Sequence, residues 1–407
     1  MRKLLTLLVI LMISLPTFAL FDSNSENPAG IAHRNYAQLY FPGLTYDLNI
    51  SNSLLQLDDI NMFREGKVLS ENDKKILTGG NLDLLGSFKT TALDFGYKNW
   101  NFSVEAITCW EAKLLDNTYS KIVFYGNELN KAYETHAGKG SEAFGFVKTS
   151  VTYAYPHDLS LGMIPGLFPE KADGILGTLK DMPINVGARL NLNRALAYGG
   201  VLESDQQFGS MPDSAYYNIY GKVAYSDEDT KGKLSPSFGF GLQTTFGDGK
   251  FNFSLDDIGL KLSYDDLAGG EISKVVTDSL LYLQNNFESY EYENIENDSL
   301  RISSIKKTFN PSFSIGVEYN FWEKLDAILK YSSSQISNND GLLVGASYNL
   351  GCMPLQAFYG NNGISYYQFN TGLRFNHFEW EVGATFYHGF FRYTKGIGLN
   401  SGMVFKF

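Results

Sequence analysis

The chain of 407 residues contains little cysteine, little proline and no excess of basic residues. Its two cysteines, Cys109 and Cys352, are too few for a disulfide framework or a four-ligand zinc site. Lys and Arg number 33 against 44 Asp and Glu and form no basic cluster, so we expect no binding to nucleic acid. Beyond the N-terminus no apolar run reaches about 18 residues, which excludes a membrane-spanning helix there.

Glycine and aromatic residues, in contrast, are abundant. The chain has 40 Gly, 30 Phe and 26 Tyr, and the share of glycine, roughly a tenth, exceeds the usual share of about 7%. A hydrophobic content of 44% is too high for a disordered chain. This composition favours one large all-β unit over two or three small soluble domains.

The N-terminus has the pattern of a secretory signal peptide. Arg2 and Lys3 precede an apolar stretch that runs from Leu4 to Leu15, and a small-x-small motif ends at Ala19. We therefore predict a signal peptide over residues 1–19, with cleavage after Ala19. The apolar stretch is short for a membrane anchor, and the absence of a nearby cysteine argues against a lipoprotein.

Apolar and polar residues alternate with a period of two through the C-terminal hundred residues, which indicates β-strands. In one such strand the apolar face carries Phe378, Trp380, Val382, Ala384 and Phe386. Counting back from Phe407 gives seven strands, the first beginning near Pro311. A soluble sandwich would place the apolar faces inside. Strands of about 10 residues with aromatics near their ends instead favour a transmembrane barrel whose apolar faces meet lipid.

The chain ends inside an alternating strand, in which Phe405 and Phe407 share one face. A terminal Phe in this position is similar to the recognition signal for outer-membrane barrel assembly. We therefore expect the barrel-assembly machinery and outer-membrane lipid as partners, and a Gram-negative outer membrane as the location. The predicted fold is all-β, a transmembrane antiparallel β-barrel of about 14 strands, with 16 as the alternative.

Turns and loops follow a barrel pattern, with short turns on the periplasmic side. Tight turns are expected at 247–249, 322–324, 351–353 and 376–377, and a long polar loop from Asp265 to Thr308. The alternation changes phase near Asp257, which predicts a β-bulge. Helical insertions are expected at Asp58–Leu77, where Ser70 and Asp73 resemble a capping box, and at three further segments. These are Tyr119–Tyr133, Ala172–Lys180 and Ile272–Leu283.

Asn27, Pro28 and Ala29 lie just after the predicted signal peptide. An Asn-Pro-Ala element there resembles the hatch of the FadL superfamily of outer-membrane barrels, which includes hydrophobic-compound transporters and the PorV-type barrels of a secretion system. The run Ser254–Gly259, followed later by Asn310–Phe313, is similar to a pattern in that group. The resemblance implies a hatch over residues 20–42 and a barrel over 43–407.

If the apolar faces meet lipid, several charged side chains must point into the lumen, because charges are costly on the lipid face. The lumen-facing candidates are Glu318, Asp326, Lys330, Arg374, Glu379 and Glu381. Glu379 and Glu381 lie near Arg374 of the adjacent strand and could form an ion network that either braces the wall or lines a solute path. No apolar stripe is evident on the lumen faces.

No catalytic motif or metal-ligand spacing is evident, and the five histidines are scattered. We therefore expect no catalytic residue, no metal, no cofactor and no enzymatic activity. The resemblance implies a channel or transporter, like a porin, for a small hydrophobic ligand. The alternative is a non-transporting scaffold or shuttle for secreted or surface proteins. The signal peptide predicts export across the inner membrane in either case.

Overall fold

The computed structural model describes residues 27–407 except 33, 35, 64–67, 158, 161, 163–179, 213, 280–290 and 337–339. The predicted signal peptide and nearly all of the predicted helix Ala172–Lys180 lie outside these residues. None of the helices in the described part of the chain is long and apolar enough to cross a membrane.

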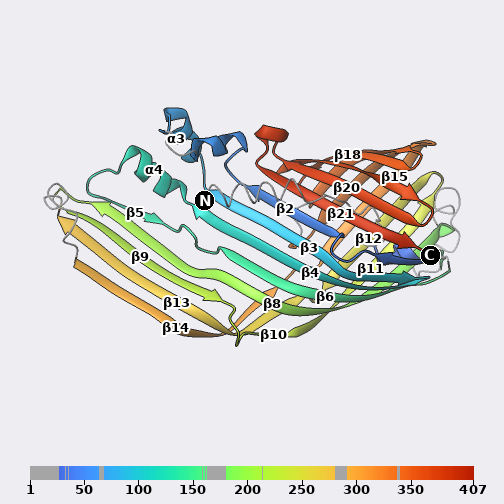
Figure 1. Cartoon of the computed structure of the whole chain (residues 1–407), viewed down its shortest axis with the longest axis horizontal. Helices are drawn as coiled ribbons and strands as arrows, with labels where there is room; N and C mark the ends of the chain where they lie inside the picture. Colours follow the sequence, from blue (N-terminus) through green and yellow to red (C-terminus); the bar gives the residue numbers. More distant parts are fainter. Residues whose placement is uncertain are drawn as a thin grey trace.

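The strands pair antiparallel with their sequence neighbours and close into a 14-strand barrel (Figure 1). The first barrel strand has two parts, β1 (Ala37–Tyr40) and β2 (Tyr46–Asn52). The next four are β3 (Leu82–Tyr97), β4 (Trp100–Leu115), β6 (Glu142–Ala154) and β8 (Pro183–Ser210). Short strands β5 (Lys131–Thr135) and β7 (Leu159–Ser160) pair with β8.

Three composite strands follow. The first comprises β9 (Ser214–Tyr225), β10 (Lys231–Gly232) and β11 (Leu234–Phe246). The second comprises β12 (Gly249–Ile258) and β13 (Lys261–Ser279), and the third β14 (Glu291–Thr308) and β15 (Ser312–Trp322). The last six are β16 (Leu325–Ser333), β17 (Gly341–Leu350), β18 (Met353–Asn361), β19 (Ser365–Phe375), β20 (Phe378–Tyr387) and β21 (Gly396–Lys406).

The barrel closes where both parts of the first strand pair with β21. At this closing seam the Ala37 amide donates to the Phe407 carbonyl at 3.1 Å, and the Phe407 amide donates to the Ala37 carbonyl at 2.8 Å. The wall therefore begins at Ala37, before the predicted boundary at residue 43. The seven strands counted back from Phe407 are confirmed as β15 to β21.

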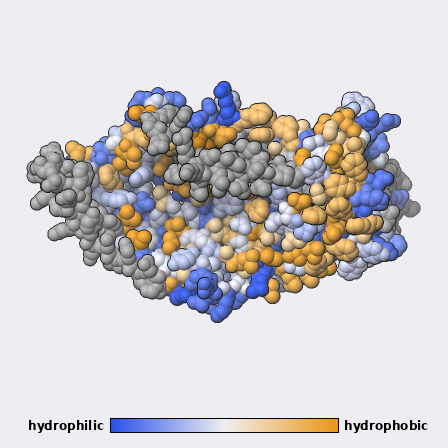
Figure 2. All heavy atoms as spheres, viewed as in Figure 1, coloured by the Kyte–Doolittle hydropathy of each residue, from blue (hydrophilic) through white to orange (hydrophobic). Residues whose placement is uncertain are grey.

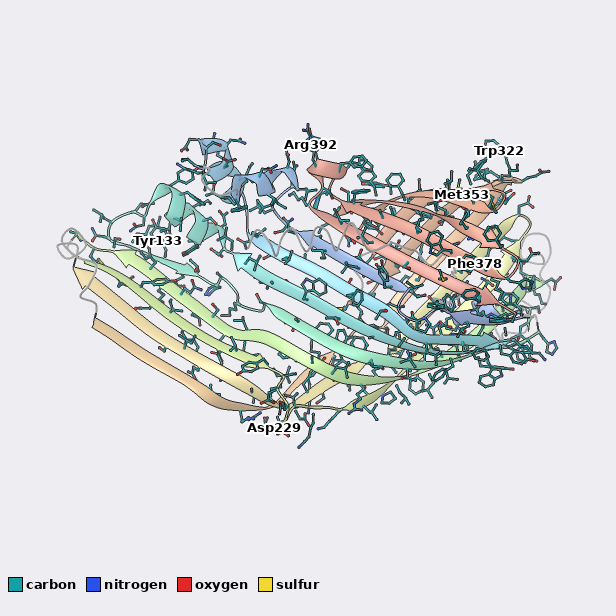
Figure 3. All side chains as sticks on the ribbon, viewed as in Figure 1. Tyr133, Asp229, Trp322, Met353, Phe378 and Arg392 are labelled. Atoms are coloured by element: carbon teal, nitrogen blue, oxygen red, sulfur yellow. The ribbon has the colours of Figure 1, made fainter. Side chains whose placement is uncertain are left out.

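The wall presents apolar residues outward, and the part of β8 that lies in the wall presents polar residues inward. Leu190 and Leu192 of β8 are 44% and 47% exposed, whereas Asn191 and Asn193 between them are 0% exposed. Figure 2 shows hydrophobic residues spread over the wall, and Figure 3 labels Trp322 and Phe378 near the end with the short turns. An outward apolar wall and a polar interior are the arrangement of a barrel that spans an outer membrane.

Short turns at 247–248, 323–324, 351–352 and 376–377 mark one end of the barrel, here called the turn side. The longer connections mark the opposite end, the loop side, which is the extracellular end in barrels of this kind. The loop side carries η2 (Asp58–Phe63), α3 (Glu71–Leu77), α4 (Asn117–Tyr125) and η4 (Phe391–Tyr393). The predicted capping box is confirmed, since Ser70 and Asp73 bond each other's backbone amides at 2.8 and 3.2 Å.

Three expected loop-side features were wrong. The segment Asp265–Thr308 contains the paired strands β13 and β14 instead of a long loop, and residues 272–279 of the expected helix belong to β13. The β-branched run Val275, Val276 and Thr277 favours a strand, and β9 and β14 pair on its two sides. The expected helix Tyr119–Tyr133 ends at Tyr125, because Gly126 takes a φ of 82°.

A sheet of five strands, β5, β8, β9, β13 and β14, continues past the barrel on the loop side (Figure 1). The strands bend where their pairing is interrupted, and the predicted bulge is confirmed there, with Asp257 at a φ of 57° and Gly259 at 86°. Arg301 bonds Asp227 at 2.7 Å and Asp229 at 3.0 Å beside this bend. Desolvation opposes ionisation of Asp227, but hydrogen bonds from Thr230 and Arg301 lower the pKa of its carboxyl below the usual range.

Deletion of Phe407 is expected to impair folding of the barrel, because it removes both backbone hydrogen bonds to Ala37 and one aromatic of the predicted assembly signal. The measurement is the fraction of purified protein that migrates differently with and without boiling on a detergent gel. Phe321→Ala is the matched control, since Phe321 is exposed on β15, away from the seam. Equal folded fractions for both variants would contradict the role of Phe407.

Candidate functional site: the barrel interior

The interior faces of β6, β8, β11 and β12 carry a buried network of charges and amides. The Lys148 ammonium contacts the carboxylates of Asp256 at 3.2 Å and Asp257 at 2.7 Å. The Arg189 guanidinium contacts Asp256 at 2.8 Å. Two positive and two negative charges therefore balance, which is the condition under which charges are tolerated in a buried site.

Neutral side chains satisfy the remaining polar atoms of this network. Asn191 donates to Asp256 at 3.0 Å and to Ser237 at 3.2 Å, and Ser150 donates to Asn191 at 2.8 Å. Arg189 donates to Thr152 at 3.0 Å. These residues reach one another because directly paired residues of adjacent strands share a face. The network thus ties β6, β8, β11 and β12 together across the inside of the wall.

The Asn27–Ala29 element lies on the same interior face, toward the turn side of the network. It forms the start of η1 (Pro28–Ile31), in which the Asn27 side chain accepts from the Ala29 amide at 3.0 Å. The Asn27 amide group donates to the Leu242 carbonyl of β11 at 2.9 Å. Asn27, Pro28, Ala29 and Ile31 are all buried.

Two paired glycines allow η1 to approach the wall. A Cβ at Gly187 of β8 would lie 2.2 Å from the Pro28 backbone, and a Cβ at Gly241 of β11 would lie 2.0 Å from Asn27 Oδ1. Neither distance is possible for real atoms, so any other residue would displace η1. A second contact fixes the chain after η1, where Arg34 donates to Asn101 of β4 at 3.2 Å.

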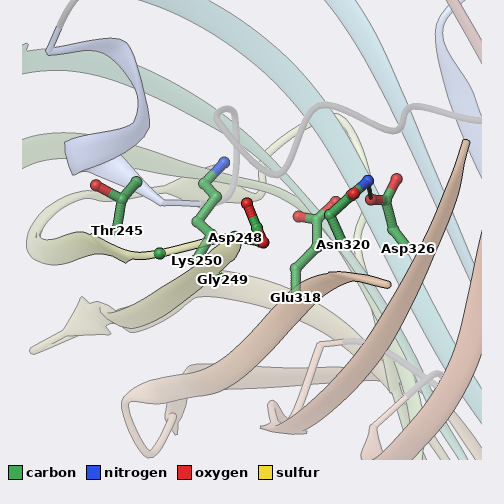
Figure 4. Close-up of a pocket in the computed structure, with 8 residues that line it drawn as sticks. Thr245, Asp248, Gly249, Lys250, Glu318, Asn320 and Asp326 are labelled. Atoms are coloured by element: carbon green, nitrogen blue, oxygen red, sulfur yellow. Dashed lines mark hydrogen bonds between the residues drawn. The ribbon is translucent and has the colours of Figure 1, made fainter. Parts of the chain in front are cut away.

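A pocket of about 350 Å³ opens at the turn side (Figure 4). Glu318 and Asp326, two of the predicted lumen residues, line it together with Asp248, Lys250 and Asn320. Asn320 donates to Asp326 at 2.7 Å. Lys330 of β16 lies on the same strand face as Asp326, opposite to the exposed Leu329 and Tyr331.

The other predicted lumen residues form two separate ion pairs near the closing seam. Arg374 of β19 donates to Glu381 of β20 at 2.6 and 3.0 Å. Glu379, which faces Arg374 in the strand register, instead contacts Lys406 of β21 at 2.5 Å. The expected network of Arg374 with both glutamates is thus replaced by one ion pair between β19 and β20 and another between β20 and β21. Both pairs link adjacent strands of the wall beside the seam.

One part of the interior, toward the loop side, is apolar, which contradicts the expectation of no apolar stripe. Its buried residues pack into one cluster from six barrel strands, here called the apolar chamber. They are Ile107, Cys109, Phe144, Phe146, Ala195, Tyr198, Ala224, Leu260, Leu262, Tyr264, Leu267 and Phe309. The stripe is hidden in the sequence because each strand contributes only one to four of these residues, and polar residues occupy the same face farther along.

A cavity of about 260 Å³ adjoins the apolar chamber. Cys109, Phe144, Phe309 and Ile336 lie in its lining. Ile336 belongs to the connection between β16 and β17, and its carbonyl accepts from the Cys109 thiol at 3.4 Å. Lys307 forms an ion pair with Glu142 at the edge of the cavity, and its ammonium lies 4.1 Å from the centre of the Phe144 ring.

Sequence analysis missed the network around Lys148, although a signal for it was present. On β8, Arg189, Asn191 and Asn193 occupy alternate positions between lipid-facing leucines, which is the period of a lumen face. Among the described residues, no group of three or more His, Cys, Asp or Glu side chains is placed to hold a metal ion.

Lys148→Met is expected to lower the free energy of unfolding by about 3 kcal/mol, because it leaves buried carboxylates without their ammonium partner. Denaturant unfolding in lipid vesicles, followed by tryptophan fluorescence, measures this loss. Lys261→Met is the control, since Lys261 is exposed. The double variant Lys148→Met/Asp257→Asn should regain part of the stability, and a double variant no more stable than Lys148→Met would contradict a direct pairing.

No model of a known protein family matches the chain, and no curated protein sequence is similar to it at a significant level. Solved structures similar to it include the CymD monoaromatic hydrocarbon channel, at 11% identity and a TM-score of 0.40, covering 96% of this chain and 93% of that one. A Pseudomonas aeruginosa FadL homologue aligns at 12% identity and 0.39, covering 96% and 94%. A TodX monoaromatic hydrocarbon channel mutant aligns at 9% identity and 0.46, with the same coverage. The fold itself is established by the strand pairing and closure described above.

Proposed function

We propose that this protein is an outer-membrane channel for small hydrophobic molecules. The observation that carries the proposal is the cavity of about 260 Å³ that adjoins the packed side chains of the apolar chamber inside the barrel wall. Ligand sites are typically concave and mostly apolar, with a few polar groups at defined positions. Cys109, Phe144 and Phe309 supply apolar surface here, and the Lys307–Glu142 pair, Glu111 and Gln335 supply polar groups.

On the turn side of the apolar chamber, the interior of the barrel becomes polar. A solute that leaves the chamber toward the turn side meets the charged network around Lys148 and then η1. We infer that η1 is a hatch, because it is buried against the inside of the wall and the Asn27 side chain bonds the Leu242 carbonyl there. Capture in the chamber and release after movement of the hatch would then make up one transport event.

The alternative role, a scaffold for secreted or surface proteins, is favoured by the five-stranded sheet beyond the barrel. β8 has 28 residues, which at about 3.3 Å per residue spans roughly 90 Å, whereas the 10 residues of β20 span about 33 Å. Such a sheet offers a large surface to another protein. A polypeptide that co-purifies with the wild type, and not with a variant lacking this sheet, would favour the scaffold.

Gly187→Ala is expected to displace the hatch and raise the ion conductance of the barrel, because the new Cβ overlaps the Pro28 backbone. Single-channel recording in planar bilayers measures the effect. Gly199→Ala is a closely matched control, since Gly199 lies on the same strand and a methyl group added there would meet no atom within 4 Å. An unchanged conductance in Gly187→Ala, with the barrel folded, would argue against a hatch.

Cys109→Phe is expected to slow the uptake of a hydrophobic probe, because the larger side chain fills the cavity beside Phe144. The measurement is the rate at which N-phenyl-1-naphthylamine becomes fluorescent in cells that produce equal amounts of folded protein. Cys352→Phe is the control, since Cys352 is exposed in the turn between β17 and β18. Equal uptake rates for wild type and Cys109→Phe would contradict passage through the chamber.

A further inference from the structure

Aromatic side chains are exposed on the loop side, in the connection between β20 and β21. Phe391 is 74% exposed and Tyr393 is 50% exposed, and both belong to η4. Phe391 has a φ of 50°, an uncommon conformation for a bulky residue, so the surrounding packing must hold it in place. Figure 3 labels Arg392 at the outer edge of this connection.

Packing of the preceding residue, Phe390, joins η4 to the outer wall of the barrel. Its ring centre lies 4.1 Å from that of Tyr367 and 5.9 Å from that of Phe369, both on β19. The Phe391 ring lies 5.5 Å from the ring of Phe386 on β20. Phe369 is 44% exposed on the lipid-facing side of the wall. The aromatic surface of η4 is therefore continuous with the surface that already meets lipid.

A second loop-side segment extends the same surface. Leu57 donates its amide to the Thr394 carbonyl at 2.8 Å, which ties the start of η2 to the end of η4. Ile60 and Phe63 of η2 are exposed, while Met62 of the same helix is buried with Leu55 and Leu77. This small core supports η2 from behind and leaves apolar side chains on its outer surface. We call η2 and η4, with Leu57 and Phe390, the aromatic lobe.

We propose that the aromatic lobe is embedded in the outer leaflet of the membrane, with its rings at the boundary between acyl chains and headgroups. Three observations support lipid as the occupant: the lobe continues the lipid-facing wall, its exposed residues are aromatic and aliphatic, and Arg392 lies beside them. Aromatic rings concentrate at membrane interfaces, and an arginine there extends its charge toward headgroup phosphates while its stem stays in contact with apolar groups.

The Arg392 side chain is held against the neighbouring Tyr393. Its guanidinium lies 4.7 Å from the centre of the Tyr393 ring and donates to the Tyr393 hydroxyl. The guanidinium and the hydroxyl are thus held together at one edge of the apolar surface, where lipid phosphates would meet them. The barrel is consequently anchored on this side by loop residues as well as by its wall, whatever solute it carries.

Site-directed spin labelling tests the proposal in the full chain. The background is Cys352→Ser, because Cys352 is exposed and Cys109 is buried. Nitroxide labels are attached to Phe391→Cys, to Leu329→Cys as the lipid-facing reference on β16, and to Asn72→Cys as the control on the exposed side of α3. Each variant is reconstituted in phosphatidylcholine–phosphatidylglycerol vesicles, checked for heat-dependent migration, and exposed to oxygen and to nickel-EDDA.

Oxygen concentrates among acyl chains and the nickel complex stays in water, so the ratio of the two collision rates reports the depth of the label. We expect the ratio at Phe391 to shift from the value at Asn72 toward the value at Leu329. A ratio at Phe391 equal to that at Asn72 would overturn the proposal. Low collision rates with both reagents would also overturn it, because they would show that a second protein surface covers the lobe. A label at Phe63→Cys provides an independent measurement if the Phe391 variant does not fold.

Discussion

The absence of water inside a membrane dominates this structure, because every backbone amide and carbonyl must find a partner within the protein. The closing seam meets that requirement, with β1 and β2 both paired to β21 and with Ala37 bonded to Phe407. Without the seam, the first and last strands would expose unpaired edges to lipid. The first and last strands of the barrel are therefore paired with each other. The arrangement of side chains inside the barrel depends on that closure.

Closure fixes which side chains face inward, and those side chains must then satisfy one another. The period of two that places Leu190 and Leu192 on lipid also places Arg189 and Asn191 inside. Two positive and two negative charges balance in one buried network, which ties neighbouring strands together and is neutral overall. Next to this network, Gly187 and Gly241 have no side chain, which leaves room for η1 to pack against the inside of the wall.

Between β4 and β15 the interior is divided along the barrel axis, with the charged network toward the turn side and the apolar chamber toward the loop side. The division arises within single strands: on β6, Lys148 and Ser150 are followed toward the loop side by Phe146 and Phe144 on the same face. An enclosed apolar chamber beside a polar section suits a channel that accepts hydrophobic molecules at one end. The aromatic lobe belongs to the outer surface instead, where it continues the wall at the loop-side rim.

The sequence by itself determined the strands β15 to β21, the bulge at Asp257, the capping box of α3 and the barrel class, because each depends on local periodicity or on a few adjacent residues. The same periodicity predicted that Glu381 and Arg374 share a face, and their side chains bond each other. Only the tertiary structure decided the pairing of Lys148 with Asp257, the apolar chamber and the strands β13 and β14. Lys148 and Asp257 are 109 positions apart, and such contacts arise from strand register and closure, which no local pattern encodes.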